Sequence, residues 1–236
     1  MKVLVLQHLA VEHPGVFRDF LREDGFAWHT VELDDGEPIP DLETYDVMIV
    51  MGGPQDTWQE DRFPWLKPEK AAIRRFVADM GRPYLGLCLG HQLLADALGG
   101  HVGPGTRPEV GALTISQTEA GRKDPLLAGV PDPVEVLQWH GAEVKALPDG
   151  AVHLARSDAC EIQAFRYGRF AYGLQCHVEA TRDTVADWAA IPEYARALEA
   201  TLGAGSVERL AAEVTDRLPT YTSVARTLYT NFKSLL

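Results

Sequence analysis

Cys88 stands in a local pattern that could turn its thiol into a nucleophile. It is the central residue of Gly86-Leu87-Cys88-Leu89-Gly90, and an apolar run ending at Leu87 precedes it. That run predicts a buried parallel strand, and the pattern over 91–98 predicts a helix that begins at once. A strand, a tight turn and a helix form a nucleophile elbow, in which glycines allow strand and helix to approach closely. The helix dipole would favour the reactive thiolate.

His177 can serve this thiol as a base, and Glu179 can orient that base. The two residues are separated by one position and lie at the end of a strand expected over 170–175. We expect them to share one strand, whose alternation would turn both side chains to the same side. Glu179 would then accept a hydrogen bond from the imidazole and fix its tautomer, as in a Cys–His–Glu triad.

Acyl transfer at such a thiol also needs hydrogen-bond donors for the oxyanion that forms. The backbone N–H of Leu89, at the start of the helix, is one candidate. Gly52-Gly53 closes a buried strand expected over 45–51, and its glycines would let the backbone approach a substrate. Taken alone, Gly52-Gly53 is also compatible with an ordinary turn at the end of a strand.

Other interpretations of the same residues are open at this point. Cys88 can be a buried core cysteine, and His177 can be an edge histidine whose neighbours satisfy it. A metal site could use Cys176, His177, Glu179 and His140, but no two of these ligands have the spacing of a zinc site. We expect neither a metal nor a cofactor.

The first hundred residues alternate between strands and helices. Strands are expected over 3–6, 26–33, 45–51 and up to Leu87, and helices over 14–23, 69–80 and 91–98. This rhythm predicts an α/β fold with a doubly wound, mostly parallel sheet flanked by helices. Ligands bind such sheets beyond the carboxyl ends of the strands, where Gly52-Gly53 and Cys88 lie.

The pattern changes after residue 100. Short alternating runs such as 110–115 predict a small antiparallel extension over 101–133, and 134–139 predicts a strand that ends at His140-Gly141. Strands then follow over 152–156, 162–167 and 170–175, and helices over 185–190, 193–201 and 206–235, the last broken at Pro219. Residues 1–236 are expected to form a single domain, with helices over about 182–236 packed on the same core.

Composition argues against several function classes. The chain of 236 residues has a formal net charge of −12 and no run of Lys or Arg longer than two, which disfavours nucleic acid and anionic membranes as partners. No apolar run approaches the length of a membrane span, and Met1-Lys2 leads directly into a strand rather than a signal peptide. Three widely separated cysteines do not suggest disulfides, so we expect a cytoplasmic protein.

Four motifs together carry a resemblance to a known family. In chain order they are Met51-Gly52-Gly53-Pro54, Gly86-Leu87-Cys88-Leu89-Gly90-His91-Gln92, Gln138-Trp139-His140-Gly141 and Gly173-Leu174-Gln175-Cys176-His177-Val178-Glu179. On these motifs the chain resembles the class I, or triad, glutamine amidotransferases, and more closely the stand-alone relatives of the amidotransferase domain of GMP synthase. The resemblance implies a flavodoxin-like sheet of the class I glutamine amidotransferase type.

The resemblance implies that the chain hydrolyses glutamine to glutamate and ammonia through a γ-glutamyl thioester on Cys88. His177 would be the general base and then the acid, and Glu179 would orient it. The N–H groups of Gly53 and Leu89 would form the oxyanion hole. The substrate-binding residues would be Gly52, Gln92, Trp139, His140 and Gly141, whereas His91 is expected to be structural.

Two positions depart from the family pattern. The family usually has proline between the histidine and the glutamate, where this chain has Val178. It usually has phenylalanine before the histidine, where this chain has Cys176. The order of the catalytic side chains is kept, and strand alternation would turn Cys176 away from His177, which predicts a core position for Cys176.

The chain carries no nucleotide-binding motif, neither Gly-x4-Gly-Lys-Ser/Thr nor a Ser-Gly-Gly loop. Ammonia made here would therefore pass to a separate ATP-dependent synthetase subunit, or the enzyme would act alone. A second hypothesis is a self-sufficient γ-glutamyl peptidase or hydrolase with the same triad. A third is a non-catalytic regulatory or thiol-sensing module. The ammonia acceptor, the oligomeric state and the activity of the isolated chain are left open.

Overall fold

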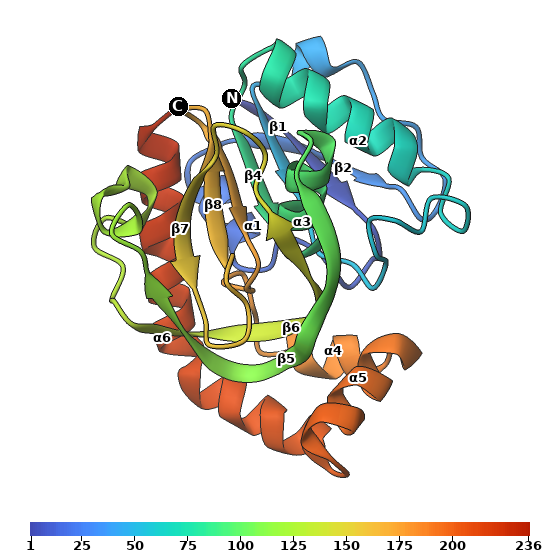
Figure 1. Ribbon diagram of the computed structural model, residues 1–236, viewed down its shortest axis with the longest axis vertical. Coiled ribbons are helices and arrows are strands. Elements are labelled where there is room, and N and C mark those ends of the chain that lie inside the picture. Colours follow the sequence, from blue (N-terminus) through green and yellow to red (C-terminus); the bar gives the residue numbers. More distant parts are fainter.

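The computed structural model describes residues 1–236 and contains one nine-stranded sheet with helices on both faces (Figure 1). The strands are β1 (Lys2–Gln7), β2 (Ala27–Glu32), β3 (Val47–Val50), β4 (Tyr84–Leu87), β5 (His101–Gln117), β6 (Val134–Ala146), β7 (Val152–Arg156), β8 (Ala164–Tyr167) and β9 (Ala171–Leu174). The α-helices are α1 (Phe17–Glu23), α2 (Leu66–Arg74), α3 (Leu89–Ala97), α4 (Thr184–Ala189), α5 (Pro192–Leu202) and α6 (Ser206–Ser234).

Five parallel strands form the first part of the sheet, in the order β2-β1-β3-β4-β9. The chain moves outward from β1 to β2 and then returns to the other side of β1 as β3. The direction of winding therefore reverses between β1 and β3, and doubly wound sheets bind ligands beyond the carboxyl ends of strands at such a point. The fold class predicted from the sequence is confirmed.

The strands β8, β7, β5 and β6 continue the sheet beyond β9 in antiparallel fashion. β5 is one strand of 17 residues rather than a series of short runs, and 110–115 lies in its second half. A shift of register between Pro104 and Glu109 accommodates Gly105 and Pro108, residue types that ordinarily interrupt a strand. β6 likewise continues to Ala146, so the predicted strand end at His140-Gly141 is wrong.

Alternation along β1 divides the core into two layers. Val3 and Val5 point into a cluster with α1 and the second half of α6, whereas Leu4 and Leu6 point into a cluster with α2 and α3. All four side chains are almost completely buried. A strand covered on both faces needs apolar residues at every position, which explains the unbroken apolar run in the sequence.

A third hydrophobic cluster joins α4, α5 and the first half of α6 to the long β5–β6 pair. Its centre holds Trp139 of β6, Trp188 of α4 and Tyr194 of α5, with ring centroids 5.5, 5.9 and 5.8 Å apart. In Figure 1 these helices lie below the curved β5–β6 pair, at the end of the molecule opposite the two termini. The helices that follow β9 thus pack on two clusters, and the single-domain assignment stays a prediction.

The long helix α6 passes through Pro219 without ending, so the predicted break there is wrong. Proline removes one helical hydrogen bond and kinks or breaks an isolated helix. Val214 and Tyr221, on either side of Pro219, are both buried in the third cluster, and this packing holds the two halves in one helix. Neither α6 nor any other helix of the chain combines the length and the apolar character needed to cross a lipid bilayer.

Candidate active site

Cys88 lies between β4 and α3, at the carboxyl end of a central strand. Its φ of 50° makes it the only residue other than glycine with a positive φ. Such a conformation costs about 1–3 kcal/mol and is found mainly at functional sites. A methyl group on Gly90 would lie 2.2 Å from the carbonyl oxygen of Val50, and one on Gly86 would lie 2.5 Å from the backbone of Gly90. The strained elbow and the role of its glycines are as predicted.

His177 and Glu179 follow β9 but do not continue it, so the expected shared strand is wrong. β9 ends at Leu174, and His177 is tied to β6 by one bridge, in which its N–H donates to the Leu137 carbonyl at 2.8 Å. Nδ1 of His177 nevertheless lies 2.8 Å from Oε1 of Glu179, and both side chains are almost fully buried. The predicted hydrogen bond is therefore present, and it fixes the orientation of the ring.

The His177 ring carries a proton over an extended pH range. Burial lowers its pKa, but the Glu179 carboxylate and the Cys88 sulfur outweigh this effect and together raise the pKa well above 6.5. An imidazolium in this position stabilises negative charge on sulfur and can donate a proton to a leaving group. Trp188 covers the ring edge-on, with centroids 4.5 Å apart.

A second buried carboxyl group, that of Glu12, lies beside this pair and was not identified from the sequence. Its Oε1 accepts a hydrogen bond from the Tyr194 hydroxyl of α5, and its Oε2 has no partner. Polar atoms of Glu12, His177 and Glu179 all lie within 4.8 Å of one another. Burial raises the pKa of Glu12, while His177 and the Tyr194 hydroxyl partly oppose the rise. Glu12 is therefore close enough to influence the protonation of His177.

The two backbone donors proposed for an oxyanion hole both lack an acceptor within the protein. Neither the Leu89 N–H nor the Gly53 N–H makes a hydrogen bond, although both belong to well-packed segments. A methyl group on Gly53 would lie 3.0 Å from Cδ2 of Leu89, so the loop after β3 touches the start of α3. On Gly52 a methyl group would lie 3.1 Å from Cε1 of His177. These glycines therefore pack directly against the elbow and the imidazole.

A cavity of about 170 Å³ opens next to the elbow cysteine. It is lined by six of the ten site residues predicted from the sequence, namely Cys88, Gly53, Gln92, Trp139, His140 and Gly141. The other four, Gly52, Leu89, His177 and Glu179, lie outside its wall. Gln92 donates its Nε2 to the Ala142 carbonyl and to Gln175 Oε1, so a ligand would meet its carbonyl oxygen.

The remaining wall of this cavity comes partly from helix α5, which the sequence had not associated with the site. Glu193, Tyr194 and Ala197 of α5 face it, together with Asp56 from the loop after β3. The lining contains the carboxylates of Asp56 and Glu193 but no lysine or arginine. Burial raises the pKa of Asp56. The cavity therefore offers acceptors and negative charge to an ammonium group of a ligand.

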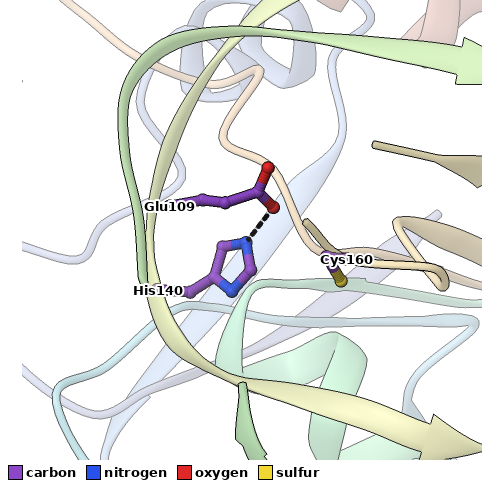
Figure 2. A group of neighbouring side chains, drawn as sticks. All are labelled: Glu109, His140 and Cys160. Carbon is purple, nitrogen blue, oxygen red and sulfur yellow. Dashed lines mark hydrogen bonds and ion pairs between the residues drawn. The ribbon is translucent and has the colours of Figure 1, made fainter. Parts of the chain in front are cut away.

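Behind the cavity wall, His140 belongs to a buried hydrogen-bonded cluster (Figure 2). Its Nε2 lies 3.1 Å from Oε2 of Glu109 and its Nδ1 lies 2.9 Å from the Ala142 carbonyl. Glu109 also accepts from Gln163 Nε2 at 2.7 Å and from the Ser157 hydroxyl at 2.8 Å. Burial raises the pKa of Glu109, but the hydrogen bonds from His140 and Ser157 outweigh burial and lower it. The cluster thus holds His140 rigidly in the wall.

Of the four ligands of the hypothetical metal site, only His177 and Glu179 come together. His140 is grouped with Glu109 and Cys160, whereas His177 is grouped with Glu12 and Glu179. In the first group, both Glu109 oxygens already accept protein hydrogen bonds, and the Cys160 thiol donates to the Ile162 carbonyl at 3.6 Å. Burial raises the pKa of Cys160, which keeps it a thiol. This arrangement fits a hydrogen-bonded wall better than a set of metal ligands.

Two other residues of the sequence motifs belong to the core. Burial lowers the pKa of His91 to about 3, and its ring packs edge-on against Phe165 with centroids 5.0 Å apart. Cys176 is 1% exposed and lies in the first hydrophobic cluster. The core position predicted for Cys176 is confirmed, and the burial of His91 is consistent with the structural role expected of it.

The chain is similar to amidotransferase-like proteins and to a γ-glutamyl peptidase. The chain is 34% identical over 190 residues to the glutamine amidotransferase-like protein YfeJ of Salmonella typhimurium, covering 78% of each protein. It is 32% identical over 180 residues to a glutamine-hydrolyzing GMP synthase subunit of Archaeoglobus fulgidus, covering 76% of this chain and 89% of that one. Gamma-glutamyl peptidase 5 of Arabidopsis thaliana is 30% identical over 174 residues, covering 72% of this chain and 68% of the peptidase.

Solved structures and the family pattern agree with these relatives. A glutamine amidotransferase from Thermotoga maritima superimposes with a TM-score of 0.87 at 28% identity, covering 98% of this chain and 97% of that one. The sequence pattern of the family "Glutamine amidotransferase class-I" matches residues 18–187, which include the elbow, the His177–Glu179 pair and the cavity wall except its α5 residues. The chain therefore belongs to the class I glutamine amidotransferase family.

Proposed function

We propose that this protein hydrolyses the side-chain amide of glutamine, giving glutamate and ammonia, with Cys88 as the nucleophile. The observation that carries the proposal is the arrangement around His177. Its ring is held by Glu179 at 2.8 Å, is acted on by the Cys88 sulfur, and has a raised pKa. A thiol on a strained elbow, an oriented imidazole and a cavity beside them are the parts that thiol-dependent acyl transfer needs.

The reaction proceeds in two halves. The Cys88 thiolate attacks the γ-carbonyl carbon, the carbon–nitrogen bond breaks, and the protonated His177 gives its proton to the leaving nitrogen, which departs as ammonia. Water then attacks the thioester, His177 takes one proton from it, and the carbon–sulfur bond breaks to release the Cys88 thiolate and glutamic acid, which ionises to glutamate; the thiolate and the protonated His177 are thereby restored. Glu179 orients the ring throughout and stabilises its positive charge.

The remaining predicted residues have supporting roles in this proposal. The N–H groups of Leu89 and Gly53 receive the charge that develops on the carbonyl oxygen. Gln92 and the segment Trp139-His140-Gly141 bound the cavity for the glutamine side chain, and Gly52 sets the position of Gly53. The carboxylates of Asp56 and Glu193, which the structure adds to the predicted residues, attract the α-ammonium group of the substrate. The unpaired state of the two N–H groups supports the first of these roles.

The proposal is tested by measuring ammonia and glutamate release from glutamine by the purified chain. We expect equal amounts of both products, and Cys88→Ala should abolish them. Cys160→Ala and Cys176→Ala are matched controls, because both remove a buried thiol outside the cavity and should leave turnover within a few-fold of wild type. A Cys88→Ala protein that still hydrolyses glutamine would exclude the mechanism.

A second candidate function is hydrolysis of γ-glutamyl peptides by the same residues. It is favoured by the similarity to gamma-glutamyl peptidase 5, and the reaction differs only in the group attached to the amide nitrogen. Comparing kcat/KM for glutamine with that for γ-glutamyl dipeptides separates the two. A preference for the dipeptides, without any partner, would assign the peptidase reaction.

We further propose that ammonia passes to a separate ATP-dependent synthetase subunit. The similarity to the glutamine-hydrolyzing GMP synthase subunit of Archaeoglobus fulgidus supports such a partner. The measurement is glutaminase activity of this chain with and without a candidate synthetase and its substrates. Stimulation that is lost in Cys88→Ala supports transfer, whereas full activity of the isolated chain without any stimulation supports a self-sufficient hydrolase.

A further inference from the structure

His8, directly after β1, has a buried ring with a hydrogen-bond partner on each nitrogen. Nδ1 lies 2.8 Å from the carbonyl oxygen of Gly52, and Nε2 lies 2.8 Å from Oε1 of Glu69 on α2. A carbonyl oxygen can only accept, so Nδ1 must carry the proton that it donates. The ring also stacks on Trp65 with centroids 5.3 Å apart. His8 is therefore held on three sides and points one N–H at Gly52.

The carbonyl of Gly52 and the N–H of Gly53 belong to the same peptide unit. In a planar trans peptide these two groups point in opposite directions. A donor that holds the Gly52 oxygen on one side therefore directs the Gly53 N–H to the other side. Gly53 lines the cavity next to Cys88, and its N–H has no acceptor within the protein. The bond from His8 thus aims this N–H away from His8 and Glu69.

Gly52-Gly53 needs such a constraint more than another pair of residues would. Glycine has no Cβ to restrict its backbone, so the peptide between two glycines can rotate by half a turn at little cost. In the rotated state the Gly52 carbonyl oxygen, and not the Gly53 N–H, would face a substrate. An oxyanion would then be repelled by the negative end of the carbonyl dipole. The side chains of Gln55 and Leu89 also fill the space around Gly53, but only His8 holds the Gly52-Gly53 peptide by a hydrogen bond.

We propose that His8 is a positioning residue that locks the Gly52-Gly53 peptide with its N–H directed at the oxyanion site, and that Glu69 holds the His8 ring in place. This inference rests on the proposed function, because it takes the Gly53 N–H as an oxyanion donor. Burial lowers the pKa of His8, but Glu69 and the Gly52 carbonyl outweigh it, so the pKa is raised and the ring keeps its proton. Glu12 is the other charged group that acts on it.

Two substitutions of His8 each keep one of its two hydrogen bonds and remove the other. In His8→Asn the amide nitrogen occupies the same bond position as Nδ1, so the donor to Gly52 is kept and the contact with Glu69 is lost. In His8→Gln the amide nitrogen occupies the bond position of Nε2, so the contact with Glu69 is kept and the donor to Gly52 is lost. A purely structural His8–Glu69 pair would make Asn the more damaging change, whereas peptide positioning makes Gln the more damaging one.

The experiment measures two rates on each variant of the full chain. The first is acyl transfer from γ-glutamyl p-nitroanilide, which needs the oxyanion hole. The second is alkylation of Cys88 by iodoacetamide, followed by mass spectrometry, which needs only the reactive thiol. We expect His8→Gln to lose about 10²–10³-fold in acyl-transfer kcat, with KM within a few-fold, because one oxyanion donor is misdirected. His8→Asn should retain at least about tenfold more activity than His8→Gln, and both should be alkylated at the wild-type rate.

Controls make each outcome decisive. His29→Asn is the matched control, because His29 lies beside Tyr45 in the parallel half of the sheet, outside the cavity wall, and its loss should leave both rates unchanged. Equal acyl transfer by the Asn and Gln variants, or a fall in alkylation parallel to the fall in acyl transfer, overturns the positioning role. A wild-type protein that is alkylated at Cys88 but has no acyl-transfer activity instead overturns the proposed function.

Discussion

Replacing Gly90 by alanine tests whether the packing of the elbow sets its reactivity. The new methyl group would lie 2.2 Å from the carbonyl oxygen of Val50 and 2.8 Å from its carbonyl carbon. Ordinary contact begins at 3.4 Å, so the start of α3 must move away from β3 by about 3.4 − 2.2 = 1.2 Å. Val50 is completely buried in a central strand, so it cannot give way instead.

This displacement has two measurable consequences. Overpacking of a buried site should lower the free energy of unfolding by about 1–3 kcal/mol, as measured by urea denaturation. Since Cys88 and the Leu89 N–H move with the start of the helix, kcat/KM for glutamine should fall by about 10²-fold, the effect expected of a 1 Å misplacement.

Gly103→Ala in β5 is the matched control for this prediction. A methyl group there would meet nothing nearer than Cγ of Lys145 at 3.6 Å, which is an ordinary contact. This variant should keep both its stability and its kcat/KM. A Gly90→Ala protein with wild-type kcat/KM would refute the claim that close packing of α3 on β3 holds the thiol and its N–H neighbour in position.

Three further results are expected. Glu179→Gln should lower kcat by about 10²–10⁴-fold with little change in KM, measured by ammonia release, because the ring loses its charged orienting partner. The pH profile of kcat/KM should show no loss of activity as the pH rises through 6.5, because the protonated His177 ring is the acid and its pKa is raised. Activity should fall only where the pH passes that raised pKa. A fall near pH 6.5 would contradict this role of His177. Trp188→Ala should cost about 3–5 kcal/mol of unfolding free energy in urea, because a large buried side chain leaves a cavity between α4 and β6; a cost below about 1 kcal/mol would exclude that packing role.

The parts of the site that could be predicted from the sequence are those whose residues lie close together in the chain. Cys88 with its flanking glycines, and His177 with Glu179 two positions later, each carry their geometry within a few residues. The predicted hydrogen bond within the second pair is present even though the expected strand is not, because the bridge from His177 to Leu137 holds the segment in place. Local spacing therefore predicted the pairing but not the backbone that produces it.

The residues that the sequence did not reveal depend on how distant segments meet. His8 and Glu12 follow β1, and they approach Gly52 and His177 only because the chain reverses its winding between β1 and β3. Tyr194 reaches Glu12 because α5 folds back over the cavity. Nothing in the neighbourhood of these residues in sequence sets them apart from other core polar groups, so their roles needed the tertiary structure.

Errors in the predicted elements have the same origin. Pro219 and the glycines and prolines of 103–108 are local signals for breaks, yet a helix and a long strand pass through them. In both cases packing or strand pairing over many residues outweighs the cost at one position. The parallel half of the sheet was predicted more closely, because its central strands β1, β3 and β4 are short, mostly apolar runs separated by clear turns.

The most direct test of the account is to trap the covalent intermediate on the elbow thiol. Wild-type protein is mixed with glutamine, quenched in acid at short times and digested, and each cysteine-containing peptide is analysed by mass spectrometry. We predict a γ-glutamyl group on the Cys88 peptide, formed and lost at rates that account for ammonia release. Release of ammonia with no such group on Cys88, or with the group on Cys160 or Cys176, would contradict the account.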